Sequence, residues 1–225
     1  MIRITFHYDK SGIVTPEASH LKTGRKLTSE RINYEEPKVS DIVFRINPRF
    51  VVFAVDISWS MEGEKLDSAK TGVIENSRTL FDIYGGNCQI AVITFGTGAE
   101  KVCDPTSDLG VIESRVNTIA PSGTTQMDDG INLAMQYVSR APSGWDRDIV
   151  LVTDGMPDTD RTNKTLKAAD KARNDGINLC TLGIGSQDVD EDFLKKMTDI
   201  TLVIEPGDNM ASGIATLLRQ AEKKH

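Results

Sequence analysis

An unbroken apolar run, from Val51 to Val55, ends abruptly in an acidic residue that hydroxyl residues follow. The run is too short for a membrane-spanning helix, and a continuous apolar stretch of this length is typical of a strand that is buried on both faces. Asp56, Ser58 and Ser60 follow at intervals of two residues, and Gly63 then allows a turn into a helix. Such a strand needs other elements packed on both of its faces, as strands have in open α/β sheets.

Strand and helix patterns alternate from Arg49 onward. Apolar spacing and helix-ending glycines predict helices over residues 64–83, 107–119, 163–175, 190–197 and 208–222, and one more that Thr125 opens with capping-box spacing. Strands are predicted at residues 89–95, 148–154, 177–184 and 200–204, and a turn at residues 96–98 leads into an antiparallel strand at 99–103. The alternation predicts a doubly wound, mostly parallel sheet with one antiparallel edge strand and helices on both faces.

Residues 1–47 follow a different pattern. Apolar residues alternate with polar ones at residues 2–8 and again at residues 42–46, which is the periodicity of strands with one solvated face. A charged stretch that contains glycine and proline separates the two, as in a loop. We therefore predict a small β-rich extension, residues 1–47, that packs on a main domain formed by residues 48–225.

Charge and composition argue against several classes of function. The 225 residues carry a formal net charge of −7, which argues against a surface for nucleic acid or for an anionic membrane. No apolar run approaches the roughly 20 residues that cross a bilayer, and the first residues lack the apolar segment of a signal peptide. Three cysteines without C-x-x-C spacing and three scattered histidines argue against a zinc site. A cytoplasmic protein is therefore expected.

Oxygen-bearing side chains stand in three segments where a predicted strand or loop meets the start of a helix. The first segment holds Asp56, Ser58 and Ser60, the second Thr125, and the third Asp154. In open α/β sheets, ligands bind in the crevice outside the carboxyl ends of the strands. Hard oxygen ligands favour magnesium, manganese or calcium over zinc or copper. The sequence thus predicts a site for a divalent cation at this end of the sheet.

These three segments together resemble a known motif. Asp56-x-Ser58-x-Ser60, the threonine of Ser-Gly-Thr-Thr125, and Thr-Asp154-Gly155 are similar to the metal-ion-dependent adhesion site of von Willebrand factor type A domains. The resemblance covers roughly residues 49–220, with the three pieces in the family's order, and implies that family's Rossmann-like fold. Both Thr124 and Thr125 could fill the threonine position. Gly130, a small residue five positions further on, favours Thr125 and leaves Thr124 as the alternative.

The resemblance also implies how the site works. Ser58, Ser60 and Thr125 would give hydroxyl ligands directly to the cation, with Mg²⁺ expected and Mn²⁺ or Ca²⁺ as alternatives. Asp56 and Asp154 would act mainly through bound water, or one of them directly. Few direct anionic ligands leave the positive charge of the cation incompletely balanced. An Asp or Glu carboxylate from a partner protein would then complete the octahedral shell that magnesium requires.

The expected function is therefore a divalent-metal-dependent protein–protein interaction module, an intracellular adaptor or assembly factor and not an enzyme. Two residues beside the metal ligands are predicted to contact the partner: Trp59, which stands between Ser58 and Ser60, and Met156, which follows the third motif segment. The Trp59 ring either faces outward beside the metal or folds back over the edge of the sheet. An outward tryptophan is a favoured interface anchor.

Two alternatives remain open. A magnesium-dependent hydrolase or phosphotransferase would also use strand-end aspartates, but the motif segments contain no histidine or lysine to act as acid, base or phosphate clamp. Lys65, the nearest cation to the first segment, is expected in the solvated turns of the first helix. In a metal-free scaffold, by contrast, the same Asp, Ser and Thr residues would serve only as helix caps and turn formers.

Overall fold

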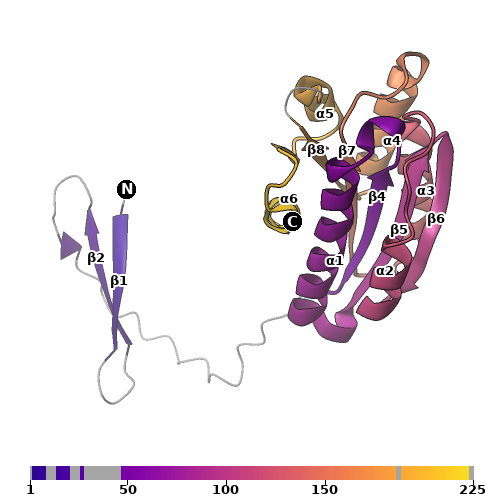
Figure 1. Cartoon of the computed structure of the whole chain (residues 1–225). Helices are drawn as coiled ribbons and strands as arrows, with labels where there is room; N and C mark the ends of the chain where they lie inside the picture. The colour runs from indigo at the N-terminus through magenta and orange to yellow at the C-terminus, as the bar shows by residue number, and fades with distance from the viewer. Residues whose placement is uncertain (1, 9–13, 21–25, 28–46, 186–188, 223–225) are drawn as a thin grey trace. The chain divides into compact units, whose positions relative to one another are not determined.

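The computed structural model describes residues 2–8, 14–20, 26–27, 47–185 and 189–222. The chain divides into two compact units, Met1–Arg45 and Ile46–His225 (Figure 1). In the smaller unit, β1 (Ile2–Tyr8), β2 (Val14–His20) and β3 (Lys26–Leu27) form an antiparallel sheet in that order. β1 matches the strand predicted at residues 2–8. The strand predicted at residues 42–46 lies outside the described residues, as does the predicted packing of the extension on the main domain.

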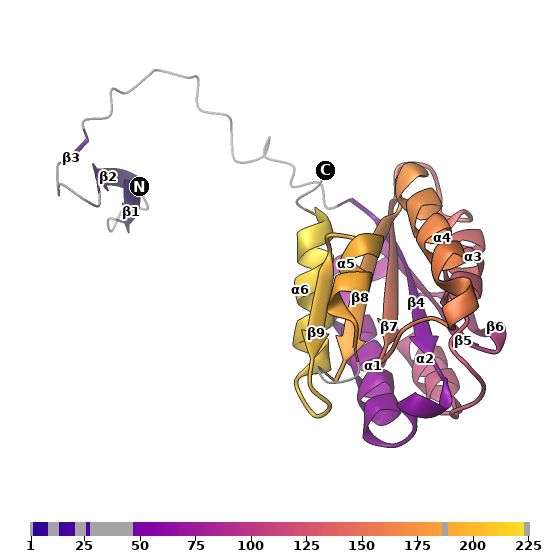
Figure 2. The same ribbon diagram turned by 90° about the horizontal axis from the view of Figure 1, so that it is seen from above.

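The larger unit is built around a sheet of six strands in the order β6-β5-β4-β7-β8-β9 (Figure 2). In chain order the strands are β4 (Arg49–Asp56), β5 (Cys88–Gly96), β6 (Gly98–Thr106), β7 (Asp146–Thr153), β8 (Asn178–Ile184) and β9 (Thr201–Ile204). All neighbours pair in parallel except β5 and β6, which are antiparallel. The predicted mostly parallel sheet with one antiparallel edge strand is confirmed.

Helices cover both faces of this sheet, as predicted for a doubly wound fold. The core on one face includes residues of α1 (Glu64–Tyr84), α2 (Leu109–Val116) and α6 (Met210–Glu222). The core on the other face includes residues of α3 (Met127–Val138), α4 (Thr162–Asn174) and α5 (Glu191–Met197). Short 3₁₀ turns lie at η2 (Trp59–Met61), η3 (Gly85–Asn87) and η4 (Thr159–Arg161). Within the described residues, no helix is long and apolar enough to cross a membrane.

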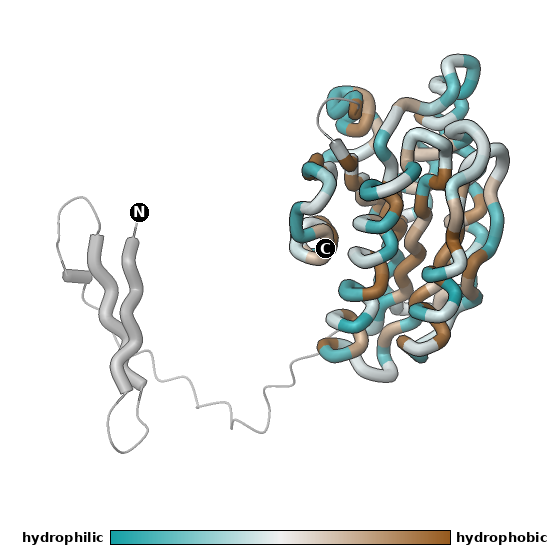
Figure 3. Tube along the Cα trace, viewed as in Figure 1, coloured by the Kyte–Doolittle hydropathy of each residue, from teal (hydrophilic) through white to brown (hydrophobic). Residues whose placement is uncertain are grey.

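Strand β4 shows why its apolar run is unbroken. All eight of its residues are buried, and the central strands are hydrophobic along most of their length (Figure 3). Because successive side chains of a strand point to opposite faces, each layer of helices takes alternate residues. One core contains Val51, Phe53 and Val55, and the other contains Phe50, Val52 and Ala54. Full burial of one such side chain is worth about 1.5–3 kcal/mol.

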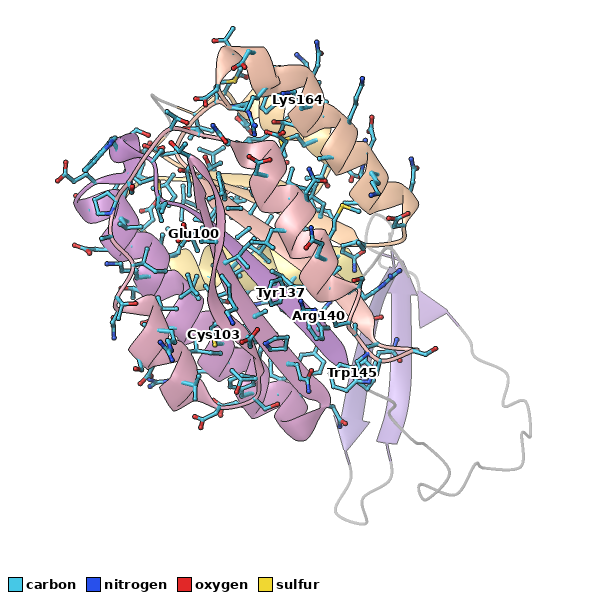
Figure 4. All side chains as sticks on the ribbon, turned by 90° about the vertical axis from the view of Figure 1, so that its right-hand side faces the viewer. Glu100, Cys103, Tyr137, Arg140, Trp145 and Lys164 are labelled. Carbon is cyan, nitrogen blue, oxygen red and sulfur yellow. The ribbon has the colours of Figure 1, made fainter. Side chains whose placement is uncertain are left out.

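Close packing against the sheet sets the position of α3. A Cβ atom built on Gly130 would lie only 2.7 Å from Cδ1 of Phe95 on β5, so only glycine fits there without a shift of the ring. Near the end of the helix, the Tyr137 ring lies under Arg140, a residue beyond α3 whose guanidinium carbon is 4.3 Å from the ring centroid (Figure 4). The Tyr137 hydroxyl donates a hydrogen bond of 3.4 Å to Asp104. The packing of Gly130 against β5 and the bond from Tyr137 to Asp104 of β6 therefore join both ends of α3 to the sheet.

Charged and polar side chains tie the amino ends of three strands together at the other end of the sheet. Arg49 of β4 lies 3.1 Å from Asp148 of β7, and the side chains are 2% and 0% exposed. Asn178 of β8 donates a 2.9 Å hydrogen bond to the second Asp148 oxygen. The guanidinium of Arg49 also lies over the ring of Tyr84, 5.6 Å from its centroid. Cys88, Cys103 and Cys180 are all buried, and none of them forms a disulfide.

Candidate metal centre

Loops from three parts of the chain meet beyond the carboxyl ends of β4 and β7. β4 and β7 are neighbours in the sheet, but the chain passes from β4 to β5 on one side and from β7 to β8 on the other. The order of the strands therefore reverses between them, and ligands of open α/β sheets bind at such a point. The amide of Ser122 donates to the carbonyl of Ile57, and the amide of Trp59 donates to that of Gly123. These bonds join the loop after β4 to the loop before α3.

Asp56 forms the floor of the site as the last residue of β4. Its side chain is fully buried. One carboxylate oxygen accepts a 2.8 Å hydrogen bond from the amide of Ser58, and the other accepts a 2.6 Å bond from the hydroxyl of Thr153. Burial raises the pKa of Asp56 to about 6, and the hydrogen bonds from Thr153 and Ser58 limit that rise. A carboxylate whose charged form is disfavoured by burial would be stabilised by a nearby cation.

A chain of hydrogen bonds connects the first motif segment to the third. The hydroxyl oxygens of Ser58 and Ser60 lie 3.0 Å apart, and the Ser60 hydroxyl donates to one Asp154 oxygen at 2.8 Å. The ammonium of Lys65 donates to the other Asp154 oxygen at 2.6 Å. Ser58 and Asp154 are buried, whereas Ser60 is exposed to solvent. Four of the five predicted ligands, Asp56, Ser58, Ser60 and Asp154, are thus connected by consecutive hydrogen bonds at one end of the sheet.

The position of Lys65 differs from the expectation for the first helix. The side chain is only 19% exposed and points to Asp154 instead of extending into solvent. The spacing of residues along α1 places Lys65 in its first turn, but it does not reveal that β7 ends beside that turn. The absence of a lysine from the motif segments therefore did not mean the absence of a lysine from the site.

Thr125 lies in the loop before α3, but it does not cap that helix. The predicted capping box is wrong, because α3 begins at Met127 and its N-cap is Gln126, whose side chain makes no capping bond. Gln126 instead accepts a 3.0 Å hydrogen bond from the amide of Gly98. Within the described part of the chain, the Thr125 hydroxyl makes no hydrogen bond to the other four predicted ligands. The structure places it at the loop junction without showing a contact between its hydroxyl and theirs.

Asp158 connects the loop after β7 to the threonine loop. It accepts a 2.8 Å hydrogen bond from the Thr124 hydroxyl and a 3.3 Å bond from the Thr125 amide. Its own amide donates to the Thr125 carbonyl at 3.1 Å. The Thr124 hydroxyl is therefore engaged away from the other motif residues, which favours Thr125 as the candidate ligand.

Arg161 reinforces the same junction from η4. Its guanidinium lies 2.9 Å from Asp128 and 2.6 Å from Asp129 in the first turn of α3. The sequence does not reveal the pairing of Arg161 with the two aspartates or the two-way bond of Asp158. No local pattern marks such pairs, because their members are more than thirty residues apart.

The predicted partner-contacting residues are both exposed. Trp59 is 62% exposed and Met156 is 41% exposed. The tryptophan ring therefore faces solvent and does not fold back over the edge of the sheet. Large apolar side chains on the rim of a polar site are typical of binding surfaces.

The donor set fits a hard divalent cation. Among the described residues, no group of three or more His, Cys, Asp and Glu side chains is arranged to hold a metal ion. A site of that composition is therefore not found in this part of the chain. The linked carboxylates and hydroxyls of Asp56, Ser58, Ser60 and Asp154 offer oxygen only, which is the chemistry that magnesium, manganese and calcium prefer.

Comparisons with known sequences identify one family. The profile of the von Willebrand factor type A domain matches residues 51–214. Inter-alpha-trypsin inhibitor heavy chain H4 of Sus scrofa is 28% identical over 203 residues, which is 84% of this chain and 21% of that protein. Heavy chain H4 of Bos taurus is 30% identical over 163 residues, or 67% of this chain and 17% of that protein. The chain thus spans about a fifth of the length of the curated relatives it matches.

Solved structures share the fold at low sequence identity. The conserved hypothetical protein BatB from Bacteroides thetaiotaomicron superposes with a TM-score of 0.66 at 20% identity and covers 78% of this chain and 99% of its own. The vWF domain of the type V pili tip protein Mfa5 from Porphyromonas gingivalis gives a TM-score of 0.68 at 14% identity, with 79% and 95% covered. These likenesses establish the arrangement of strands and helices.

Proposed function

Because the chain belongs to the von Willebrand factor type A domain family, we propose that it is a divalent-metal-dependent protein–protein interaction module. Members of the family act as interaction and adhesion modules. One observation carries the proposal: hydrogen bonds run from the Ser58 amide to Asp56 and through the Ser58 and Ser60 hydroxyls to Asp154, at the point where the strand order reverses.

In this proposal each side chain has a separate task. Ser58, Ser60 and Thr125 give neutral hydroxyl ligands, and Asp56 and Asp154 supply the negative charge, mainly through bound water. A bound cation, with Mg²⁺ expected and Mn²⁺ or Ca²⁺ as alternatives, provides a positive centre for an incoming carboxylate. The hydrogen bond from the Thr153 hydroxyl holds the Asp56 side chain in the floor of the site.

The partner is a protein that offers an Asp or Glu carboxylate next to apolar side chains. Trp59 and Met156 are the exposed apolar residues beside the candidate ligands. A recess of about 430 Å³ lies beside the joined loops, and its walls include Ile57 and Ser122 as well as the charged side chains Glu100, Lys101 and Arg115. An extended acidic segment that reaches the metal would have room to continue into this recess.

Metal titration tests the first half of the proposal. Calorimetry with Mg²⁺, Mn²⁺ and Ca²⁺ on the wild-type protein should detect binding that is lost in Asp56→Ala and Asp154→Ala, because these two residues carry the negative charge of the site. Asp67→Ala, which removes an exposed carboxylate of α1, is the matched control and should bind normally. If the wild-type protein binds none of the three cations, the metal-dependent proposal is wrong.

Capture of a partner tests the second half. A pull-down from cell extract in Mg²⁺ should retain a protein that is absent in EDTA and absent with Asp56→Ala. Mutation of single Asp and Glu residues in that protein should then identify the contributing carboxylate. A partner that stays bound in EDTA would contradict a metal-bridged contact.

A magnesium-dependent hydrolase or phosphotransferase is the second candidate, and one observation favours it. Lys65 contacts Asp154 and could serve as a phosphate clamp, a role that the sequence alone did not offer. Beyond Arg49 the sequence contains no histidine except His225, so the most frequent acid–base residue is absent from the described site. Turnover of phosphate esters that depends on both Asp56 and Lys65 would favour the enzyme.

The cellular setting belongs to the same proposal. We propose an intracellular adaptor or assembly role, and the net charge of −7 is unfavourable for contacts with nucleic acid or with an anionic membrane. Fractionation of cells that produce the whole natural protein tests the cytoplasmic location, which a signal confined to membranes or medium would contradict.

A further inference from the structure

Asp154 is already engaged on both of its oxygens by other side chains of the protein. Ser60 donates to one oxygen at 2.8 Å, and Lys65 donates to the other at 2.6 Å. The Asp154 side chain is 1% exposed and the Lys65 side chain 19% exposed, so this ion pair is largely shielded from water. A shielded pair interacts more strongly than a surface pair, because the effective dielectric constant around it is lower.

Helix energetics alone do not favour a lysine at position 65. Lys65 is in the first turn of α1, where the helix dipole favours negative side chains and disfavours positive ones. Glu64 and Asp67 occupy the same turn and follow that rule. Gly63, with a φ of 85°, makes the turn that starts the helix beside the end of β7. The long-range contact with Asp154 therefore accounts for a lysine that local helix energetics disfavour.

The contact between Lys65 and Asp154 changes the charge that a cation meets at the site. Asp56 and Asp154 contribute two negative charges, and Lys65 contributes one positive charge in direct contact with one of them. Arg161 does not share this role, because it pairs with Asp128 and Asp129. A divalent cation that approaches Asp154 meets an ammonium that it repels and that holds one of the oxygens the cation needs.

We propose that Lys65 is a built-in counterion of Asp154, which competes with the divalent cation and sets the affinity of the site for metal. This inference rests on the proposed metal site and adds a residue that controls its occupancy. Loading the metal requires the ammonium of Lys65 to leave the carboxylate or to tolerate the added positive charge. Lys65 is thus an affinity-setting residue and not a ligand.

Titration with Mn²⁺ alone tests the proposal. Lys65→Gln removes the charge and should bind Mn²⁺ at least about tenfold more tightly than the wild-type protein, since one fewer positive charge stands next to the cation. Lys65→Arg keeps the charge and should keep the wild-type affinity within about threefold. Lys164→Gln removes an exposed positive charge from α4 (Figure 4) and should change the affinity by less than about twofold.

Thermal unfolding provides a second readout on the same variants. Without metal, Lys65→Gln should unfold at a lower temperature than wild type, because Asp154 loses its counterion. Saturating Mn²⁺ should then raise the Tm of Lys65→Gln by more than it raises the Tm of wild type. Circular dichroism before titration checks that each variant is folded. If Lys65→Gln does not fold, Lys65→Met, which also removes the charge and keeps much of the aliphatic stem, takes its place in the comparison with wild type and Lys65→Arg.

The outcomes separate this inference from the proposed function. Equal Mn²⁺ affinity in wild type and Lys65→Gln overturns the role of Lys65 and leaves the metal site intact. Weaker binding by Lys65→Gln also overturns it. If neither protein binds Mn²⁺, both proposals fail. Binding by Lys65→Gln alone would show a lysine that excludes metal from the wild-type site, which supports the counterion and contradicts metal-dependent function.

Discussion

At the scale of single residues, Asp56 combines full burial with a position in the candidate metal centre. Its carboxylate accepts hydrogen bonds from Ser58 and Thr153, yet desolvation still raises its pKa to about 6 from an ordinary value of 3.8. Burial of the ionised Asp56 carboxylate destabilises the metal-free fold. A buried acidic residue that costs stability in this way is typical of a binding site.

The first prediction concerns the pH dependence of stability without metal. The folded-state pKa of Asp56 lies above the unfolded value, so the native state holds the proton more tightly. Its contribution is fully present below pH 3.8 and is lost as the pH rises to about 6, a difference of about 3 kcal/mol in the free energy of unfolding. Asp56→Asn carries no such charge and should lack this decline.

Urea unfolding in EDTA between pH 4 and pH 7.5 measures this difference. The free energy of unfolding of wild type should fall relative to Asp56→Asn over that range. Asp67→Asn on the exposed face of α1 serves as the control and should follow the wild-type curve. Parallel curves for wild type and Asp56→Asn would contradict a buried, proton-binding Asp56.

A second prediction at this scale concerns Trp59. Its ring is 62% exposed beside the candidate ligands, so its truncation should remove contacts with the partner and leave the metal untouched. Trp59→Ala should weaken partner binding by about 2 kcal/mol or more, while Mn²⁺ affinity stays unchanged. Calorimetry with metal and surface plasmon resonance with the captured partner separate the two effects.

Ile83 provides the matched control for Trp59. It is 55% exposed on the last turn of α1, at the opposite end of that helix from the site. Ile83→Ala should bind the partner as wild type does. Equal losses in the two variants would indicate a general effect of surface hydrophobicity and would remove Trp59 from the interface.

At the scale of elements, the loop after β7 positions the loop before α3. Asp158 holds the Thr125 segment through its side chain and its amide, and Arg161 holds the first turn of α3. Thr125 has no helix-capping bond to fix it, since α3 begins two residues later. The orientation of the candidate ligand therefore depends on a loop more than thirty residues away.

The third prediction follows from this dependence. Asp158→Ala removes the hydrogen bonds to Thr124 and Thr125, so the threonine loop should become less ordered and the Mn²⁺ affinity should fall about tenfold. Asp158→Asn keeps one acceptor and should recover part of the affinity. Asp160→Ala, an exposed neighbour in η4, should have no effect, and an equal loss there would point to charge instead of positioning.

The fourth prediction concerns the contact between α3 and β5. A Cβ atom at Gly130 would lie 2.7 Å from the Phe95 ring, so Gly130→Ala forces the helix or the ring to move. The variant should lose about 1–3 kcal/mol of stability, although alanine is the better helix former. Gly86→Ala, where a Cβ atom meets nothing within 4 Å, should be nearly neutral in the same urea experiment.

At the scale of the whole molecule, the larger unit has its own core on each face of the sheet. Among the described residues, the members of those two cores run from Phe50 to Ala221. The contacts of the chain also divide it at Arg45 and Ile46. A unit with a complete core of this kind is expected to fold independently.

The fifth prediction tests this independence. A fragment of residues 47–225 should unfold cooperatively, with a Tm within about 3 °C of the full chain, because the larger unit supplies its own core. It should also bind Mn²⁺ with the same affinity. Calorimetry of both proteins measures the two quantities, and loss of cooperative unfolding in the fragment would show that the first residues complete the fold.

Most of the fold was predictable because it depends on local periodicity. The apolar run of β4 indicated burial on both faces, and alternate residues of that run do enter two separate cores. The antiparallel β6 followed from the turn at Gly98. The start of α3 was not predictable, because Gln126 bonds to Gly98 and the threonine loop is held by Asp158, two contacts between distant segments.

The sequence by itself determined which residues form the sheet and which oxygen-bearing residues follow its strands, since burial and side-chain direction repeat with the period of each element. The tertiary structure alone decided that Lys65 lies on Asp154, that Asp158 and Arg161 hold the threonine loop, and that Trp59 faces solvent. These features depend on which distant segments meet at one end of the sheet. Local sequence patterns do not predict these contacts, because a salt bridge or a hydrogen bond between loops needs only one side chain from each loop.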